Sequence, residues 1–131
     1  MKIRQVFIAV LLAPLFSVAA FAQQGITEPQ MSVQSFEDVG ARNMADGREV
    51  YRISAATVGL VYVEWPQGTV TTPHNHANEL VLTVMSGRLK AISGDQEFIM
   101  EAGDVVTVPA WVDHSYEALE DSLTMEAVGP G

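Results

Sequence analysis

Two histidines stand one residue apart in a stretch that is otherwise rich in threonine and aliphatic residues. The stretch covers residues 68–87 and has the sequence GTVTTPHNHANELVLTVMSG. Its flanking runs are typical of β-strands, and residues i and i+2 of a strand project from the same face. The imidazoles of His74 and His76 are therefore expected to point into one space. Because imidazole is a common ligand of metal ions, the pair predicts a metal site.

One further histidine, His114, lies in the stretch GDVVTVPAWVDH. Here Gly103 is followed by five residues and Pro109, and four more residues precede the histidine. The first stretch has a matching form, in which five residues separate its opening glycine from the histidine pair. Together the two stretches resemble the two motifs of the cupin superfamily, over roughly residues 50–128. The resemblance implies that His114 joins His74 and His76 as the third ligand of one divalent metal ion.

The resemblance also bears on a fourth ligand. In cupins a carboxylate normally follows the second histidine after three or four intervening residues. In this sequence those two positions are Leu80 and Val81. Glu79 comes one residue early, and in a regular strand a shift of one residue turns a side chain to the opposite face. A bulge or turn at residues 77–78 would aim it back. Glu79 thus remains a candidate for a metal ligand and for a proton-transfer group.

The two forms of the site differ in chemistry. Three neutral imidazoles leave a divalent ion its full charge and about three open positions, which favours bidentate anionic substrates. An added carboxylate lowers the net charge and closes one position. The resemblance does not require the carboxylate for catalysis, since three-histidine sites occur in some cupin-type dioxygenases.

Two aromatic residues lie near the third histidine. Tyr116 shares the face of His114 if the strand is regular, and it is a candidate proton donor or pocket wall. The alternative is a core tyrosine with its hydroxyl at the rim. Trp111 stands where the second cupin motif usually has glycine. We expect it either to roof the mouth of the site or to be a buried core aromatic.

The first residues have the pattern of a leader. Lys2 and Arg4 precede an apolar run that ends in the small-residue pattern Ala20-Phe21-Ala22. This pattern is typical of a secretory signal peptide, here residues 1–22, and predicts a periplasmic or secreted protein. The alternative is a membrane anchor, which Pro14 and the shortness of the run disfavour.

Charge and composition exclude several function classes. The chain has 131 residues and a net charge of −9 at pH 7, and removing the leader leaves five basic and sixteen acidic residues among 109. This length corresponds to one domain. Such an acidic surface repels phosphate groups, so nucleic acid and membrane surfaces are not expected as partners. The chain contains no cysteine, which excludes disulfides and thiolate ligands.

The rest of the chain predicts short strands. Residues 23–47 are expected to form a flexible N-terminal arm and residues 48–131 the cupin domain. Turn signals divide this domain into strands at residues 49–54, 57–65, 69–76, 80–86, 88–93, 96–100, 105–108, 114–118 and 123–128. The pattern predicts an all-β antiparallel sandwich or barrel with no helix after the leader. The cupin resemblance implies the double-stranded β-helix, or jelly-roll barrel, with ligands in its mouth.

Three functions remain open. The first is a metal-dependent cupin enzyme acting on a small anionic substrate, of dioxygenase, lyase or isomerase type. His74, His76 and His114 would hold iron, manganese or zinc, with nickel and copper also suited, and Tyr116 or Glu79 would move protons. The second is a non-catalytic module that binds a sugar or small acid. The third is a structural homodimeric jelly roll with a vestigial site.

Overall fold

A computed structural model of the protein describes residues 30–129. The predicted signal peptide and the first residues of the predicted arm lie outside the described residues. Residues from Ser32 onward belong to one compact unit. Within the described part of the chain, no helix is long and apolar enough to cross a membrane.

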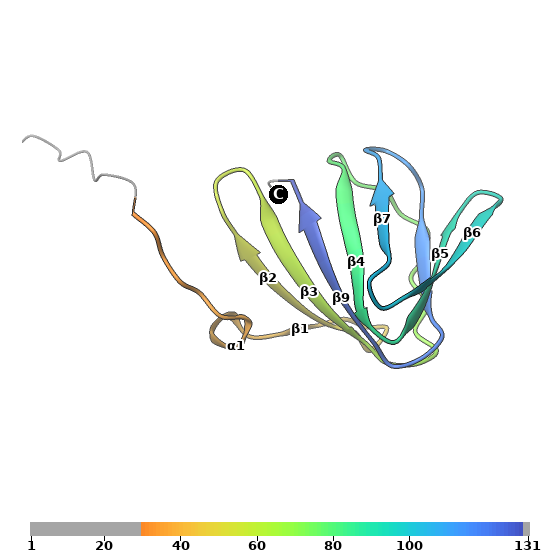
Figure 1. Cartoon of the computed structure of the whole chain (residues 1–131), viewed down its shortest axis with the longest axis horizontal. Coiled ribbons are helices and arrows are strands. Elements are labelled where there is room, and N and C mark those ends of the chain that lie inside the picture. The colour runs from red at the N-terminus through yellow and green to blue at the C-terminus, as the bar shows by residue number, and fades with distance from the viewer. Residues whose placement is uncertain (1–29, 130–131) are drawn as a thin grey trace, which may run out of the picture. The chain divides into compact units, whose positions relative to one another are not determined.

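Nearly all regular structure in this unit is antiparallel β-sheet (Figure 1). The described elements are α1 (Phe36–Val39), β1 (Arg42–Asn43), β2 (Glu49–Ser54), β3 (Gly59–Trp65), β4 (Leu80–Ser86), β5 (Arg88–Ser93), β6 (Gln96–Glu101), β7 (Val105–Val108), β8 (Ser115–Ala118) and β9 (Ser122–Val128). One sheet has the order β1-β2-β3-β9-β4-β7, and the other has the order β6-β5-β8. The two sheets confirm the predicted all-β fold and fit a jelly-roll barrel.

The core lies on one face of each strand. In β3 the side chains of Val61, Val63 and Trp65 are buried, whereas the alternate residues Leu60 and Glu64 are exposed. This is the period of two that a half-buried strand requires. The outer face of β3 is only partly covered, since Tyr62 is half-buried and Leu60 and Glu64 are exposed.

Most predicted strand bounds agree with the structure. β2, β4, β5 and β7 have the predicted bounds, and β3, β6, β8 and β9 differ by one or two residues at an end. The segment predicted as a strand at residues 69–76 instead forms isolated bridges, Val70 with Glu117 and His74 with His114. Pro73 lies between these bridges and has no N–H to donate to a continuous ladder.

A short helix departs from the expectation that no helix follows the leader. α1 lies in the segment predicted as a flexible arm, and the side chain of Ser35 caps it by accepting a hydrogen bond from the Asp38 N–H at 3.1 Å. Its Phe36 ring stacks on Tyr62 of β3, with the ring centroids 5.3 Å apart, and meets Tyr51 of β2 edge-on. Packing on the outer face of the sheet therefore stabilises this four-residue helix. The helix is too short to show helical periodicity in the sequence.

Gly87 makes the connection between the two sheets. It separates β4 from β5 with a positive φ of 80°, a conformation that glycine adopts without steric cost. A Cβ atom at this position would collide with the backbone of Asp121 and lie 2.7 Å from the Ser122 Cα. Gly94, at the turn between β5 and β6, also has a positive φ, but nothing lies within 4 Å of the corresponding position.

A buried hydrogen bond ties β3 to β9. The Trp65 Nε1–H donates to the Thr124 Oγ1 at 2.9 Å, and the two residues are 1% and 0% exposed. Thr124→Val keeps the size of the side chain but leaves the indole N–H without its acceptor. We expect the free energy of unfolding to fall by about 1–3 kcal/mol, measured by urea denaturation followed by circular dichroism. Thr107→Val on the exposed face of β7 is the control, and equal stability of the two variants would contradict the expectation.

Candidate metal centre

Main-chain hydrogen bonds bring two of the histidines together. The His74 N–H donates to the His114 carbonyl at 3.0 Å, and the His114 N–H donates to the His74 carbonyl at 2.9 Å. The two residues thus form one antiparallel pair although forty positions separate them in the chain. Beside them, the Trp111 N–H donates to the His76 carbonyl at 2.8 Å. The two histidine-bearing segments are therefore joined by their backbones.

The three imidazoles converge on one space. Their ring centroids are 4.5 Å apart for His74 and His114, 5.0 Å for His74 and His76, and 5.2 Å for His76 and His114. One ring nitrogen from each lies within 4.8 Å of the others. Metal–nitrogen bonds of about 2 Å place bound nitrogens about 3–4 Å apart, so small side-chain movements suffice to hold one ion.

Hydrogen bonds to backbone carbonyl groups orient two of the imidazole rings. Nδ1 of His74 lies 2.8 Å from the Thr72 carbonyl oxygen, and Nδ1 of His114 lies 2.9 Å from the Val112 carbonyl oxygen. A carbonyl only accepts, so each Nδ1 carries the proton and each Nε2 keeps its lone pair. The buried Nε2 of His114 has no hydrogen-bond partner among the described residues. A cation would satisfy this nitrogen, so the donor set fits a divalent metal.

Electrostatics favour the form of the rings that binds metal. Partial loss of hydration lowers the pKa of His76, although its side chain is exposed, and the neighbouring His74 and His114 lower it further. Burial also lowers the pKa of His114, against the opposing effect of its hydrogen bond to Val112. Both rings are therefore neutral at neutral pH. Because a metal binds neutral imidazole, protons compete with it only at more acidic pH.

Three cavities in the described part of the chain border the histidines, and the two larger ones, here called the histidine cavities, are both lined by His76. One has a volume of about 380 Å³ and is lined by all three histidines, and the other, of about 570 Å³, is lined by His76. Both cavities share Val61, Leu80 and Glu126. Arg48 contributes to the wall of the first and Arg52 to the wall of the second. The three histidines thus face recessed space large enough for a small molecule.

Tyr116 lies in the wall of the first cavity. It is buried, its ring centroid is 5.5 Å from that of His114, and its hydroxyl has no partner among the described residues. Its ring also packs edge-on against Trp65 in the core. Burial, and to a lesser extent the charge of Glu126, raises the pKa of the hydroxyl. Tyr116 is therefore a core aromatic that also forms part of the cavity wall, and its role as a proton donor stays a prediction.

Glu79 lies apart from the histidine nitrogens. Its side chain is exposed, it is not a member of the histidine group, and it lines neither histidine cavity. β4 begins at the next residue, the buried Leu80, so the alternation of the strand turns Glu79 outward. This is the arrangement that the register of a regular strand predicts.

The backbone conformation of Trp111 explains why the second cupin motif usually has glycine at this position. Its φ is +65°, which costs a residue with a Cβ atom far more than glycine. The side chain is 70% exposed and lines neither histidine cavity. The prediction of a buried core aromatic is therefore wrong, since most of the side chain is exposed.

Glu126 was missed by the sequence analysis. It lies on β9 and lines both histidine cavities. Burial raises the pKa of its carboxyl to about 7, against the lowering effect of Arg48 and Arg52. The sequence did contain one indication of its role. Glu126 lies two residues after Thr124 in a largely apolar strand, and this spacing places its carboxyl group on the same inner face.

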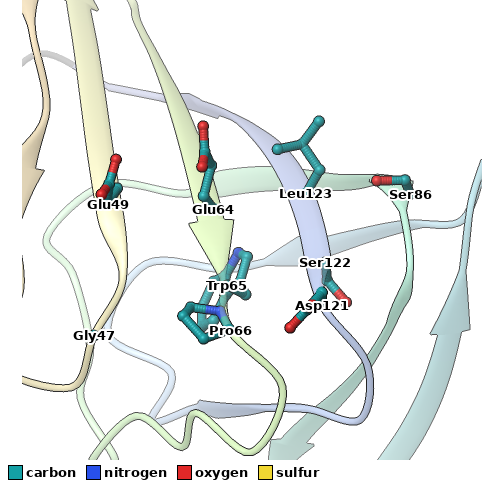
Figure 2. A pocket seen from close by; sticks show the side chains of 9 residues that line it. All are labelled: Gly47, Glu49, Glu64, Trp65, Pro66, Ser86, Asp121, Ser122 and Leu123. Carbon is teal, nitrogen blue, oxygen red and sulfur yellow. The ribbon is translucent and has the colours of Figure 1, made fainter.

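A separate acidic cavity lies at the other end of the larger sheet. Figure 2 shows Glu49 of β2 and Glu64 of β3 side by side above Trp65, with Asp121 near the start of β9. The cavity has a volume of about 470 Å³ and no histidine in its wall. Its Leu123 pairs with Ser86, whereas Leu80 beside the histidines pairs with Val128 at the opposite end of the same two strands. The acidic cavity is therefore distinct from the metal centre.

Comparisons with known proteins agree with the fold. The family model described as "Cupin domain" matches residues 61–128. Comparison with curated proteins finds no match. Among solved structures, the chain is similar to KdgF from Halomonas sp., with 22% identity, a TM-score of 0.71, and coverage of 78% of this chain and 96% of that one.

Two further solved structures are similar at comparable identity. A RmlC-like cupin from Shewanella frigidimarina has 17% identity and a TM-score of 0.71, with coverage of 78% of this chain and 93% of that one. A salicylate 1,2-dioxygenase variant from Pseudoaminobacter salicylatoxidans has 20% identity and a TM-score of 0.63, with coverage of 70% of this chain and 29% of that one. At these identities the likenesses show the fold alone.

Proposed function

The chain belongs to the family of cupin domains, and we propose that it is an enzyme that holds one divalent metal ion on His74, His76 and His114. The observation that carries this proposal is the convergence of three imidazoles, two of them with Nε2 left free by a carbonyl partner. Iron, manganese and zinc all suit this donor set. A bound ion would supply positive charge that polarises a substrate carbonyl or activates dioxygen.

A small anionic molecule is the proposed substrate. The whole chain has a net charge of −9 and only seven basic residues, yet Arg48 and Arg52 both lie in the cavity walls. The Arg48 guanidinium is held in place by Asp46, at 2.8 Å, and by the ring of Trp65, at 4.8 Å from its centroid. Positive groups in a low-dielectric cavity attract a carboxylate, which also suits the ion.

Metal content tests the proposal directly. We expect purified protein to hold about one divalent ion per chain, because three preoriented ligands favour binding to the native state. Chelation should lower the melting temperature by at least about 5 °C, and re-addition of metal should restore it. Elemental analysis and differential scanning fluorimetry provide the measurements. A protein that holds no metal and shows no shift would instead favour a structural jelly roll with a vestigial site.

A second experiment separates turnover from binding alone. Oxygen uptake in the presence of thiols or diketones would indicate dioxygenase chemistry, and a change in ultraviolet absorbance with uronates would indicate lyase or isomerase chemistry. A metal-loaded protein that binds these compounds without either signal would be the non-catalytic module. Export of the protein through cleavage of residues 1–22 is proposed on the leader pattern alone, and N-terminal sequencing of the exported protein tests it.

A further inference from the structure

Glu126 lies on the inward face of β9, where its side chain is partly buried. The inward side chains before it on this strand, Ser122 and Thr124, are both buried. Its partners in the neighbouring strands are Val61 of β3 and Leu82 of β4, both buried and apolar. A charged group in such surroundings costs free energy unless another group compensates it.

No described side chain neutralises this carboxyl group directly, since it forms neither a hydrogen bond nor an ion pair with the described residues. The two nearby arginines have other partners. Arg48 is paired with Asp46, and the Arg52 Nε donates to the Ser54 Oγ at 3.1 Å. Their charges do favour the ionised carboxylate, but the loss of hydration outweighs them. An ion pair that stabilises the fold therefore does not explain Glu126.

The carboxyl group faces the space that a substrate would occupy. It lines both histidine cavities, and His76 lines both as well. The described titratable groups around it come from several elements: Arg42 of β1, Asp46 and Arg48 of the turn before β2, Arg52 of β2, Tyr116 of β8, and the three histidines. Among these groups, Glu126 is the carboxyl group that both cavities share. Its position suits a group that exchanges a proton with a bound molecule.

We propose that Glu126 is the catalytic base that takes a proton from a carbon atom beside a carbonyl group of a small acid bound in the histidine-lined cavities. This inference rests on the proposed function and narrows it to isomerase or lyase chemistry. In the step, the carboxylate forms an O–H bond as the C–H bond breaks. The released electron pair forms a C=C bond, and the carbonyl oxygen gains the negative charge of an enolate. Return of the proton to carbon completes an isomerisation, and no oxidant is consumed.

The protonation behaviour of the group agrees with this role. A carboxyl group whose pKa lies near 7 is a stronger base than an ordinary glutamate and is still substantially ionised at neutral pH. Arg52 in the wall of the second cavity, whose Nε donates to the neutral Ser54 Oγ, would hold the carboxylate of the substrate. Base and anion site therefore lie in the same pair of cavities.

Hydrogen exchange with solvent tests the inference. Metal-loaded protein is incubated in D₂O with pyruvate or with glucuronate, and the loss of carbon-bound proton signals is followed by NMR. We expect the parent to accelerate exchange with at least one of these probes. Glu126→Gln, which has the same size but cannot ionise, should lower this rate by at least about 100-fold. Glu64→Gln, on the exposed face of β3, is the matched control and should exchange like the parent.

The pH profile separates catalysis from a structural role. In the parent the exchange rate should rise with pH as Glu126 ionises and then level off. Glu126→Asp should keep part of the rate and this profile, whereas Glu126→Gln should lose both. A merely structural role would lower the rate of all Glu126 variants without removing the profile. That result would overturn the inference.

Metal content measured on the same samples distinguishes failure of the proposed role of Glu126 from failure of the proposed metal-dependent function. Glu126→Gln should retain as much metal as the parent, because Glu126 is not a member of the histidine group. If the parent holds metal, then no exchange by the parent, or exchange by Glu126→Gln equal to that of the parent, overturns only the role of Glu126. A parent without metal overturns the proposed function, and a parent without metal and without exchange overturns both.

Discussion

Replacing His76 with alanine is expected to abolish metal retention. The variant leaves only His74 and His114, and two imidazoles do not complete a three-ligand site. Loss of a group that merely orients a ligand already costs about 10–100-fold in metal affinity, so loss of a ligand should cost more than about 100-fold. His76 is the most informative choice because its side chain is exposed, and its backbone carbonyl can still accept the Trp111 N–H.

Elemental analysis after gel filtration, followed by a competition titration with a chromogenic chelator, measures this effect. Glu79→Gln is the matched control, since this exposed carboxylate lies three positions after His76 but outside the histidine group. The control should retain metal like the parent. Retention by the His76 variant equal to that of the parent would remove the metal centre.

Gly87→Ala is expected to be the most destabilising single methyl addition among the turns of the β-sheets. The positive φ alone costs a residue with a Cβ atom about 1–2 kcal/mol. The new methyl group also collides with backbone atoms of Asp121 and Ser122, which side-chain rotation cannot relieve. Overpacking of this kind adds about 1–3 kcal/mol or more, so a total loss of at least about 3 kcal/mol is expected in urea denaturation.

Gly94→Ala isolates the conformational part of this cost. Gly94 lies at the opposite end of β5, also with a positive φ, but open space surrounds the position of the added methyl group. The loss there should stay near about 1–2 kcal/mol. Similar losses at the two glycines would show that the close contact at Gly87 does not contribute.

Local patterns account for what could be predicted of the site. The spacing of His74 and His76 on extended backbone and the motif around His114 are properties of short segments. They predicted a cluster that the structure does bring together. The outward direction of Glu79 also follows from strand alternation, with no knowledge of neighbouring strands. The bounds of β4 and β5 follow from the turn-forming glycines beside them.

Long-range pairing accounts for what could not be predicted. Glu126 faces the histidines because β9 inserts between β3 and β4, and no local pattern specifies those neighbours. The helix at Phe36 likewise depends on a ring in β3 that is distant in the sequence. Residue preferences alone would also not predict the positive φ of Trp111 or the exposure of its side chain.

The paired backbones of His74 and His114 have a consequence for the choice of ion. The reciprocal main-chain bonds set the separation of these ligands before any ion arrives, so little conformational entropy is lost on loading. A site whose ligands are all imidazoles, two of them fixed in place by the backbone, discriminates weakly among divalent ions of similar radius. The occupant is then decided by the free concentration of each ion where the chain folds, and the same polypeptide made in two surroundings would carry two different elements.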